Sequence, residues 1–405
     1  MSLLYAERYA EFGYPHDEWT RLRREAPVHF VDPERGRAYW AITRHADIVE
    51  ISRQPDLFTN WPRFKAAEGS DELAAVRTLS TMDPPDHRTY REIVSRRFTP
   101  RALEKLREPI EAVTVELMDG LELEGTTAEF DFVERVAAPL PILIIAWVLG
   151  LPREDWEHIY QLTNAAIGFA DPQFQREGES LEDTLRRSRG EIFEYFAGLS
   201  AERRKNPGED LISELACAKI DGRPLPEDEL LAYYFILVVA GNETTRNAVS
   251  GGFLAFAEHP EQWARLRADP GLLRGAVEET LRWVSPVIHH ARTAARDTEI
   301  RGVPIAKDDT LTLFYPSANR DEEVFTDPFT FRIDRPRNPH LALGVGEHVC
   351  LGAHLARLEI ELALRHLSKR IESMERIGPT LRLASANVGG IKQLPVRLHL
   401  DASRR

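Results

Sequence analysis

One cysteine-containing loop limits the folds open to this chain more than any other feature. Gly344, Gly346 and Gly352 surround Cys350 in the segment Gly344-Val-Gly-Glu-His-Val-Cys-Leu-Gly352. Residues 319–347 before it contain several prolines and little periodicity, and a loop of that length inside a compact domain is usually functional. A long amphipathic helix is expected directly afterwards, from about Ala353 to Ser373. The fold must therefore present Cys350 at the end of an irregular segment and at the start of a helix.

The surroundings of Cys350 indicate a thiolate. Glycines permit positive φ and close approach to a flat ligand, and the N-terminus of the following helix stabilises negative charge. A thiol with a pKa of about 8.5 ionises more readily in such an environment or on a metal. The other cysteine, Cys217, lies within Leu211–Ala218 with nothing reactive nearby, which is typical of a small buried hydrophobe. Two cysteines exclude a disulfide framework and any four-cysteine zinc or iron–sulfur site.

Two other sites are conceivable at this loop. His348, Cys350 and His354 offer three zinc ligands, but no matching fourth ligand is evident. A dinucleotide-binding fingerprint fails, because Val349 stands where the third glycine is needed.

Periodicity along the chain indicates a mainly α protein with small β-sheets, of the α+β class. Helical signals extend from about residue 100 to 285, and Ala102–Leu121 and Ser180–Leu199 are good examples. The strands expected are a hairpin of Val28–Val31 with Ala38–Ile42, a hairpin over Glu299–Ile305, and single strands at Thr310–Tyr315, Leu381–Leu383 and Pro395–Leu400.

The charge of the chain argues against nucleic acid as a partner. The net charge is −13, from 65 acidic and 52 basic residues, whereas phosphate binding needs a basic face. No apolar run approaches the roughly 20 residues of a membrane span, and the first residues lack the basic and apolar regions of a secretory signal. A cytoplasmic protein with no membrane span is therefore expected.

A second unusual segment interrupts an apolar helix. Tyr233–Val239 is apolar, and Ala240-Gly-Asn-Glu-Thr-Thr245 then introduces polar groups. The Thr244 hydroxyl can bond back to the carbonyl of Ala240, four residues earlier. A helix end with Gly241 as its cap is one interpretation. The amphipathic pattern resumes over Arg246–Phe256 without a turn signal, which favours a local bulge in a continuing helix.

These motifs resemble those of the cytochrome P450 family. Residues 340–359, His-Leu-Ala-Leu-Gly-Val-Gly-Glu-His-Val-Cys-Leu-Gly-Ala-His-Leu-Ala-Arg-Leu-Glu, are similar to the haem-binding signature of its soluble bacterial members. The resemblance implies a single catalytic domain over 1–405, β-rich mainly at about 25–60 and 292–400 and helical at about 65–290 and 353–373. It also implies haem b between the oxygen-activating helix and the cysteine-loop helix, with Cys350 as the axial ligand of the iron. Leu343 departs from the family pattern, which usually has a phenylalanine there to shield the thiolate.

The resemblance also assigns roles to other residues. Glu243 and Thr244 match the family's proton-relay pair, while Ala240 and Gly241 match the oxygen groove of the central helix. Leu343, Gly344 and Gly352 match positions in the haem-binding loop. The haem propionates would be held by two histidines and two arginines, which are His87, Arg91, Arg292 and His348.

An Arg–Glu–Arg triad is expected to hold the segment before Cys350. Glu279 and Arg282 share one helix face, and alone they would be taken for an ordinary surface ion pair. Their order, after the oxygen helix and before the cysteine loop, matches the family's structural motif, and Arg335 matches its third member.

The substrate pocket can be placed only by resemblance. An apolar pocket suits a steroid, a terpenoid or a fatty-acyl compound, and each of its residues is equally compatible with plain core packing. The candidates are Trp61, Pro62, Phe64, Ile167, Phe169, Phe235, Val239, Val287, His289 and Val388.

The resulting hypothesis is a monooxygenase that inserts one atom of O₂ into a hydrophobic small molecule. No flavin or reductase segment is apparent, so a separate ferredoxin with an NAD(P)H-dependent reductase would supply electrons. A basic rim for docking it, or simply a solvated one, is formed by Arg88, Arg97, Arg101, His354 and Arg357. The alternatives are a peroxygenase or oxygen-independent rearrangement enzyme and, in another class, a haem sensor or electron carrier.

Overall fold

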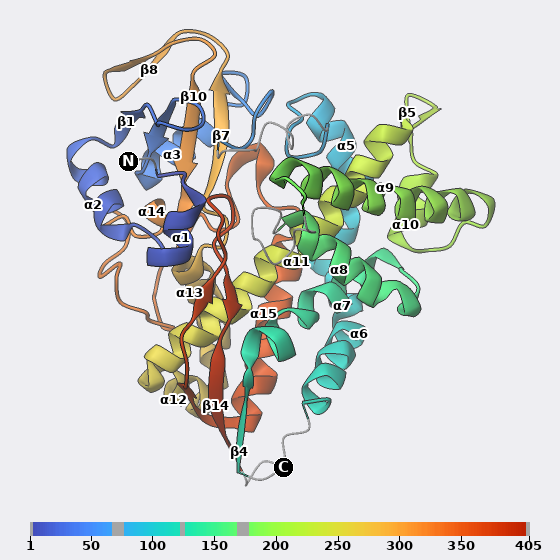
Figure 1. The fold of residues 1–405 in the computed structure, drawn as a ribbon, viewed down its shortest axis with the longest axis vertical. Coiled ribbons are helices and arrows are strands. Elements are labelled where there is room, and N and C mark those ends of the chain that lie inside the picture. The colour runs from blue at the N-terminus through green and yellow to red at the C-terminus, as the bar shows by residue number, and fades with distance from the viewer. Residues whose placement is uncertain (1–2, 67–76, 122–125, 168–177, 402–405) are drawn as a thin grey trace.

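The computed structural model describes residues 3–66, 77–121, 126–167 and 178–401 of the chain. Helices make up most of these residues, and the strands form small sheets at separate places in the molecule (Figure 1). The mainly α, α+β class expected from the sequence is confirmed.

The helices differ widely in length. Among the described residues, the longest helix has 32 residues and the shortest has four. In chain order they are α1 (Ala6–Phe12), α2 (His16–Glu25), α3 (His45–Ser52), α5 (Asp86–Ser95), α6 (Pro100–Asp119), α7 (Pro139–Leu149), α8 (Trp156–Ile167), α9 (Leu181–Lys205), α10 (Leu211–Ala216), α11 (Glu227–Glu258), α12 (Pro260–Ala268), α13 (Leu273–Val284), α14 (Tyr315–Ala318) and α15 (Ala353–Arg370).

The strands form small separate sheets. The largest has the order β1-β2-β10-β7-β3, from strands β1 (Val28–Val31), β2 (Tyr39–Ile42), β10 (Thr310–Phe314), β7 (His289–Ala294) and β3 (Phe58–Thr59). A second has the order β11-β14-β4, from β11 (Ile371–Arg376), β14 (Pro395–Leu400) and β4 (Thr127–Asp131). The remaining pairs are β5 (Lys219–Ile220) with β6 (Arg223–Pro224), β8 (Thr298–Ile300) with β9 (Val303–Ile305), and β12 (Leu381–Arg382) with β13 (Ile391–Gln393).

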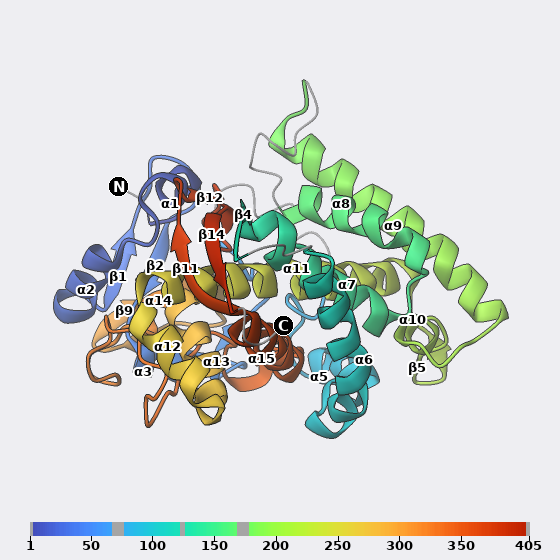
Figure 2. The same cartoon turned by 90° about the horizontal axis from the view of Figure 1, so that it is seen from below.

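Helix α11 crosses the body of the protein in both views (Figures 1 and 2). Three acidic residues, at 227–229, occupy its first turn, where they interact favourably with the positive end of the helix dipole. Figure 2 shows α8 and α9 on one side of α11 and α15 on the other. A helix enclosed in this way is apolar around most of its circumference.

The course of α11 decides between the two interpretations of its polar interruption. All 32 residues from Glu227 to Glu258 are α-helical, so the helix does not end at Gly241, and the expected bulge is also absent. The Thr244 hydroxyl donates to Ala240 O at 2.8 Å, as anticipated, but this bond coexists with regular helical geometry.

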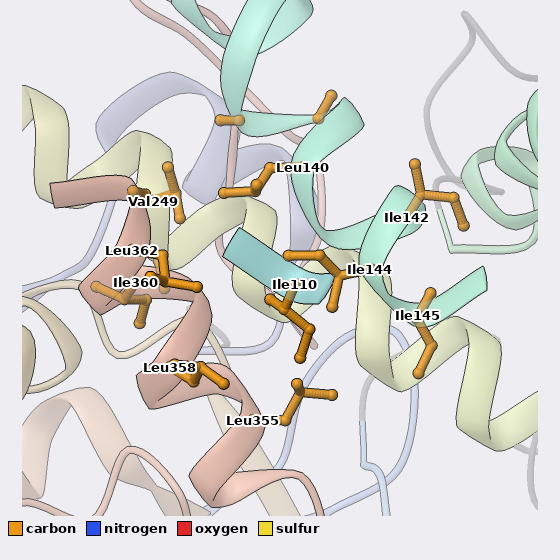
Figure 3. Close-up of a cluster of buried hydrophobic side chains, with 14 of the residues drawn as sticks. Ile110, Leu140, Ile142, Ile144, Ile145, Val249, Leu355, Leu358, Ile360 and Leu362 are labelled. Atoms are coloured by element: carbon orange, nitrogen blue, oxygen red, sulfur yellow. The ribbon is translucent and has the colours of Figure 1, made fainter. Parts of the chain in front are cut away.

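The main core lies where four helices meet. Helix α7 is apolar on every face and is buried along most of its length, as expected for a helix inside a core. Figure 3 shows side chains of α6, α7, α11 and α15 converging, among them Ile110, Ile144, Val249 and Leu358. This packing fixes α15, and therefore the start of α15 next to Cys350, against α11.

Strand β7 lies between β10 and β3 in the largest sheet. It pairs antiparallel with β10, with His289 opposite Phe314 and Arg292 opposite Leu311. On its other edge β3 pairs through Phe58 and Ala294. Residues of β7 are thereby held at fixed positions beside the segment that follows β3.

Several sequence expectations need correction. Helix α15 ends at Arg370 rather than Ser373, because Ile371 begins β11. Strand β4 lies inside the region expected to be helical, since its partner β14 comes from the far end of the chain. Cys217 is exposed rather than buried, because it caps α10 after the buried face of that helix has ended.

Across the described ranges, none of the helices combines the length and the apolar character needed to cross a membrane.

Candidate active site

The loop that carries Cys350 depends on its glycines. Gly344 and Gly346 have φ of +73° and +79°, a region that strongly favours glycine. A Cβ on Gly346 would lie 2.2 Å from Ser52 O, so only glycine allows the loop to lie against α3. The Cys350 N–H donates to Leu343 O at 2.8 Å and closes the loop. Gly352 has a negative φ of −82°, and its role is instead its N–H, which bonds to the thiol.

The groups around Cys350 have opposing effects on the ionisation of its thiol, which the sequence predicts to be a thiolate. Burial raises the pKa of the Cys350 thiol, while the Gly352 N–H and the guanidinium groups of Arg91 and Arg357 lower it. Cys350 is nevertheless accessible. A bound metal ion would complete the ionisation, since metals deprotonate coordinating thiols.

Two imidazoles beside the loop have unsatisfied nitrogens. The rings of His87, on α5, and His348 lie 4.1 Å apart between centroids. Within the described part of the chain, His87 Nδ1 and His348 Nε2 are buried without a hydrogen-bond partner. Burial lowers the pKa of His87 to about 4 and that of His348 to about 2, so both rings are neutral at neutral pH. Buried polar atoms without partners are rare and need an explanation.

Two guanidinium groups belong to the same cluster. Arg292 on β7 is buried, and the one hydrogen bond of its side chain among the described residues goes to Ala291 O, at 2.7 Å. Arg91 donates to Val349 O at 2.7 Å, next to Cys350. Neither has an ion pair with a carboxylate among the described residues. A buried charge normally has a partner. Unpartnered donors and cations beside a thiol therefore fit a ligand that brings carboxylates and a metal, as haem does.

The middle of α11 is partly open although its neighbours are buried. Ala240 is exposed and Thr244 is partly exposed within a helix that is otherwise enclosed. The missing Cβ of Gly241 faces α7, where it would lie 3.0 Å from Ile145 Cγ1. Gly241 thus has a packing role in the crossing of the two helices.

Glu243 does not face the hydroxyl of Thr244, since consecutive helical residues point in different directions. Glu243 as a residue is 2% exposed, and its carboxylate pairs with Arg246 at 2.6 Å. Asn247 also donates to it, at 3.0 Å. Arg246 in turn donates to Asn164 Oδ1 on α8 at 3.0 Å.

The expected Arg–Glu–Arg triad is assembled and is not at the surface. The side chains of Glu279 and Arg282 are 0% exposed and lie 2.7 Å apart, and Arg335 pairs with Glu279 at 3.1 Å. Arg282 also donates to the carbonyls of Asn319 and Pro328. The triad therefore ties α13 to the irregular segment that leads to Cys350.

The pocket candidates divide into several groups. His289 is 0% exposed, and both of its ring nitrogens are bonded, to Ala386 O and to the Ala66 N–H. It therefore bridges two loops, and its contact with a substrate stays a prediction. Phe235 is buried in the core against Phe193.

The other candidates are accessible to different degrees. Trp61 is half-exposed, whereas Pro62, Phe64, Val239, Val287 and Val388 are partly buried. Val287 and Val388 are joined by an isolated β-bridge. Ile167 ends α8, but its side chain and all of Phe169 lie outside the described residues.

The proposed basic rim is largely neutralised. Arg88 pairs with Glu347, Arg97 with Glu214, and Arg357 with Glu278. Arg101 and His354 are exposed. The zinc alternative also fails, because no three His, Cys, Asp or Glu side chains in the described part of the chain converge on a metal position.

Sequence reasoning missed some of the residues that organise this site. Arg246 stands three residues after Glu243, a spacing that indicates a helical ion pair. This pair could therefore have been predicted from the sequence. Asn164 and Lys65 carried no such signal, because their partners are distant in the chain.

Comparison with known proteins identifies the family. The Cytochrome P450 family model matches residues 36–372. The methyl-branched lipid omega-hydroxylase of Mycobacterium tuberculosis is 38% identical over 93% of this chain and 90% of its own length. The linalool 8-monooxygenase of Pseudomonas putida is 37% identical over 95% of each chain.

A solved structure supports the same family assignment. The crystal structure of CYP108D1 from Novosphingobium aromaticivorans matches 98% of this chain and 97% of its own with a TM-score of 0.88 at 35% identity. Proteins of this family bind haem b through a cysteine thiolate. This chain belongs to the cytochrome P450 family and is a monooxygenase of that family.

Proposed function

We propose that this enzyme hydroxylates a lipid, steroid or terpenoid at an unactivated C–H bond, with Cys350 as the axial ligand of its haem iron. The observation that carries the proposal is the cluster of His87, His348, Arg91 and Arg292 beside Cys350. It has donors and positive charge, but among the described residues no carboxylate is hydrogen-bonded to it. Names of the relatives support the substrate class, since they act on a methyl-branched lipid and on linalool.

The cluster defines how the cofactor would be held. The neutral rings of His87 and His348 would donate N–H bonds to the propionates, and Arg91 and Arg292 would offset their charge. Cys350 would supply the thiolate, and Gly344 lets the backbone turn away from it. Haem held in this way supplies the oxygen-activating chemistry of the family.

Thr244 and Glu243 would transfer the protons that the reaction needs. The Thr244 hydroxyl now donates to Ala240 O, so its oxygen is free to accept a further hydrogen bond. Glu243 is held on another side of α11 by Arg246. A proton can therefore pass from the Glu243 carboxyl to Thr244 Oγ1 only through an intervening water or a swing of Glu243 away from Arg246.

We further propose that electrons come from a separate ferredoxin with an NAD(P)H-dependent reductase. Arg101 and His354 are the exposed members of the basic rim and would face an acidic donor. Because long-range steering is screened by ions, reduction by such a donor should slow as salt is added.

The carbon monoxide complex of the reduced protein tests whether Cys350 is the thiolate ligand of the haem iron. Its Soret band should be strongly red-shifted in the wild type, and Cys350→His should abolish that shift while haem is retained. A wild-type protein without the shift would refute the thiolate ligand.

Thr244→Ala tests the reaction itself. The variant should consume O₂ and NADPH with less product per O₂, because proton delivery is disturbed. Equal coupling in both proteins would remove Thr244 from the mechanism. Turnover driven by peroxide but not by a reductase would favour a peroxygenase, and the absence of any turnover would favour a sensor or carrier.

A further inference from the structure

Strand β7 has one residue that is not buried. His290 is partly exposed, whereas the other five residues of the strand are buried. Alternate residues of a strand point to the same face, so His290 and Arg292 project from β7 on the same side. In the pairing of β7 with β10, His290 lies opposite Leu313 and Arg292 opposite Leu311 (Figure 1). His290 therefore shares the face of β7 that carries Arg292 of the proposed haem site.

The exposed part of His290 does not lie at the outer surface. Its ring is edge-on to the ring of Tyr315, with the centroids 5.6 Å apart, and the Phe64 ring lies 6.1 Å away. Burial is the largest effect that holds the pKa of His290 well below its usual value, so the ring is neutral at neutral pH. A side chain that protein atoms desolvate and that is still partly accessible is typical of the edge of a binding site.

The charges that act on His290 favour an anion beside it. After burial, the groups that lower the pKa of His290 are the Lys65 ammonium, the Arg292 guanidinium and the imidazoles of His289 and His348. Arg292 and His348 belong to the cluster proposed above to hold the haem carboxylates. Fixed positive charges and N–H donors that face one place stabilise a carboxylate there. His290 is thus next to the place where a propionate is expected.

A tyrosine sets which nitrogen of the His290 ring can donate. Tyr315 is 3% exposed, and its hydroxyl lies 3.4 Å from His290 Nδ1. This long contact is the one side-chain hydrogen bond of either residue among the described residues. Burial raises the pKa of Tyr315, so the hydroxyl keeps its proton and can donate it. A neutral imidazole has one donor and one acceptor nitrogen. When Nδ1 accepts from the hydroxyl, the ring hydrogen is on Nε2.

We propose that His290 is a further propionate-binding residue, with Tyr315 donating to its Nδ1 and its Nε2–H donating to a haem carboxylate. The proposal rests on the haem-thiolate function proposed above and adds one contact to the four residues assigned there to the propionates. Tyr315 touches no cofactor atom in this arrangement and is a positioning residue. A polar group of a substrate can accept the same hydrogen bond, so the cofactor is measured without substrate.

Resonance Raman spectra of the substrate-free, haem-loaded enzyme test the contact directly. The bending vibration of the haem propionates changes in frequency with their hydrogen bonding. His290→Leu should shift this band, and His290→Gln, which keeps an N–H donor, should restore it in part. The rate of haem transfer to apomyoglobin gives a second readout. It should rise about tenfold in His290→Leu, because a hydrogen bond to a charged group is lost.

Tyr315→Phe tests the positioning role. The variant keeps the ring but loses the hydroxyl, so the hydrogen of His290 is no longer confined to Nε2 and the propionate band should shift by less than in His290→Leu. The double variant should match His290→Leu alone, since Tyr315 acts only through His290. His158 and Tyr195 are the matched control, because they form another edge-on pair, with centroids 6.3 Å apart. His158→Leu and Tyr195→Phe should leave the band and the haem transfer unchanged.

The outcomes separate the two proposals. If the wild type has a thiolate carbon monoxide spectrum but His290→Leu changes neither the propionate band nor the haem transfer, the His290 proposal is overturned and the proposed function stands. An unchanged band together with weaker binding of a hydrophobic ligand places His290 against the substrate, which overturns it as well. If circular dichroism shows that His290→Leu does not fold, the same measurements on His290→Gln and Tyr315→Phe decide. A wild type without the thiolate spectrum refutes the proposed function itself.

Discussion

At the scale of single residues, the Glu279 carboxylate accepts more hydrogen bonds than any other carboxylate of the described residues. Its two carboxylate oxygens accept bonds from Arg282, Arg335, the Arg332 N–H and Asn338. Arg282 and Arg335 themselves are almost completely buried. Removing the carboxylate therefore leaves two buried cations without their partner, which is more costly than losing the hydrogen bonds alone.

We expect Glu279→Gln to lower the free energy of unfolding by about 3–5 kcal/mol and to reduce the amount of haem bound after expression. Urea denaturation of the haem-loaded proteins measures the first effect. Glu116→Gln is the matched control, because Glu116 pairs with Arg153 and both side chains are more than half exposed. Such a pair contributes about 0–1 kcal/mol, and equal losses in the two variants would contradict the role of the triad.

Glu278 makes a pH-dependent contribution next to the triad. Its carboxylate bonds to His340 and Arg357, and these bonds outweigh burial and lower the pKa of Glu278 to about 2. A lowered pKa in the folded state stabilises the fold fully above the unfolded value of about 4.5, and this stabilisation is lost as pH falls toward 2.

The stability difference between wild type and Glu278→Gln should therefore be constant above pH 4.5 and should shrink between pH 4.5 and 2. Denaturant unfolding at a series of pH values measures it. A difference that persists unchanged to the bottom of that range would show that the carboxylate keeps no lowered pKa.

At the scale of elements, polar side chains join α8 to α11. Asn164 accepts from Arg246 at 3.0 Å, and Thr163 accepts from Asn242 at 3.0 Å. Since Arg246 also holds Glu243, the position of α8 and the position of the candidate proton donor are connected through one guanidinium. Both bonds are buried, so neither is easily replaced by water.

Asn164→Ala should loosen α8 without disturbing the Glu243–Arg246 pair. We expect a loss of about 1 kcal/mol of global stability and faster hydrogen exchange in the amides of α8, measured by mass spectrometry. Gln161→Ala, at an exposed residue of the same helix, provides the control. Exchange that increases equally in the two variants would mean that the buried bond does not hold the helix.

At the scale of the whole molecule, haem and protein should stabilise each other through Arg292. In the protein alone this buried guanidinium has no ion pair among the described residues. Binding a group that carries carboxylates stabilises the folded state, because the unfolded chain has no such site.

Arg292→Met should therefore raise the stability of the haem-free protein and lower that of the haem-loaded protein, each by about 1–4 kcal/mol. Thermal unfolding of both forms of both proteins measures the effect. A change of the same sign in the two forms would indicate that Arg292 serves the fold and not the cofactor.

The sequence correctly predicted features whose interacting residues are close together in the chain. The Thr244 bond to Ala240, the positive φ of Gly344 and Gly346, and the Glu279–Arg282 pair all follow from spacing and residue type. The haem-thiolate family itself follows from the segment around Cys350.

Other features depended on chain segments that no local pattern connects. His289 bridges two loops because the Ala66 N–H and Ala386 O both bond to its ring. Residues 127–131 form strand β4 because β14 lies beside them. Gly241 is needed because Ile145 of α7 crosses there.

The sequence by itself determined that Cys350 stands between a glycine loop and a helix, since both depend on nearby residues and backbone geometry. Only the tertiary structure decided the electrostatics of that site. It partly desolvated the Cys350 thiol, which raises its pKa, turned Glu243 toward Arg246, and placed Lys65 Nζ against His289 O. The physical reason is that desolvation and charge pairing depend on what surrounds a group in space, and those neighbours come from distant parts of the chain.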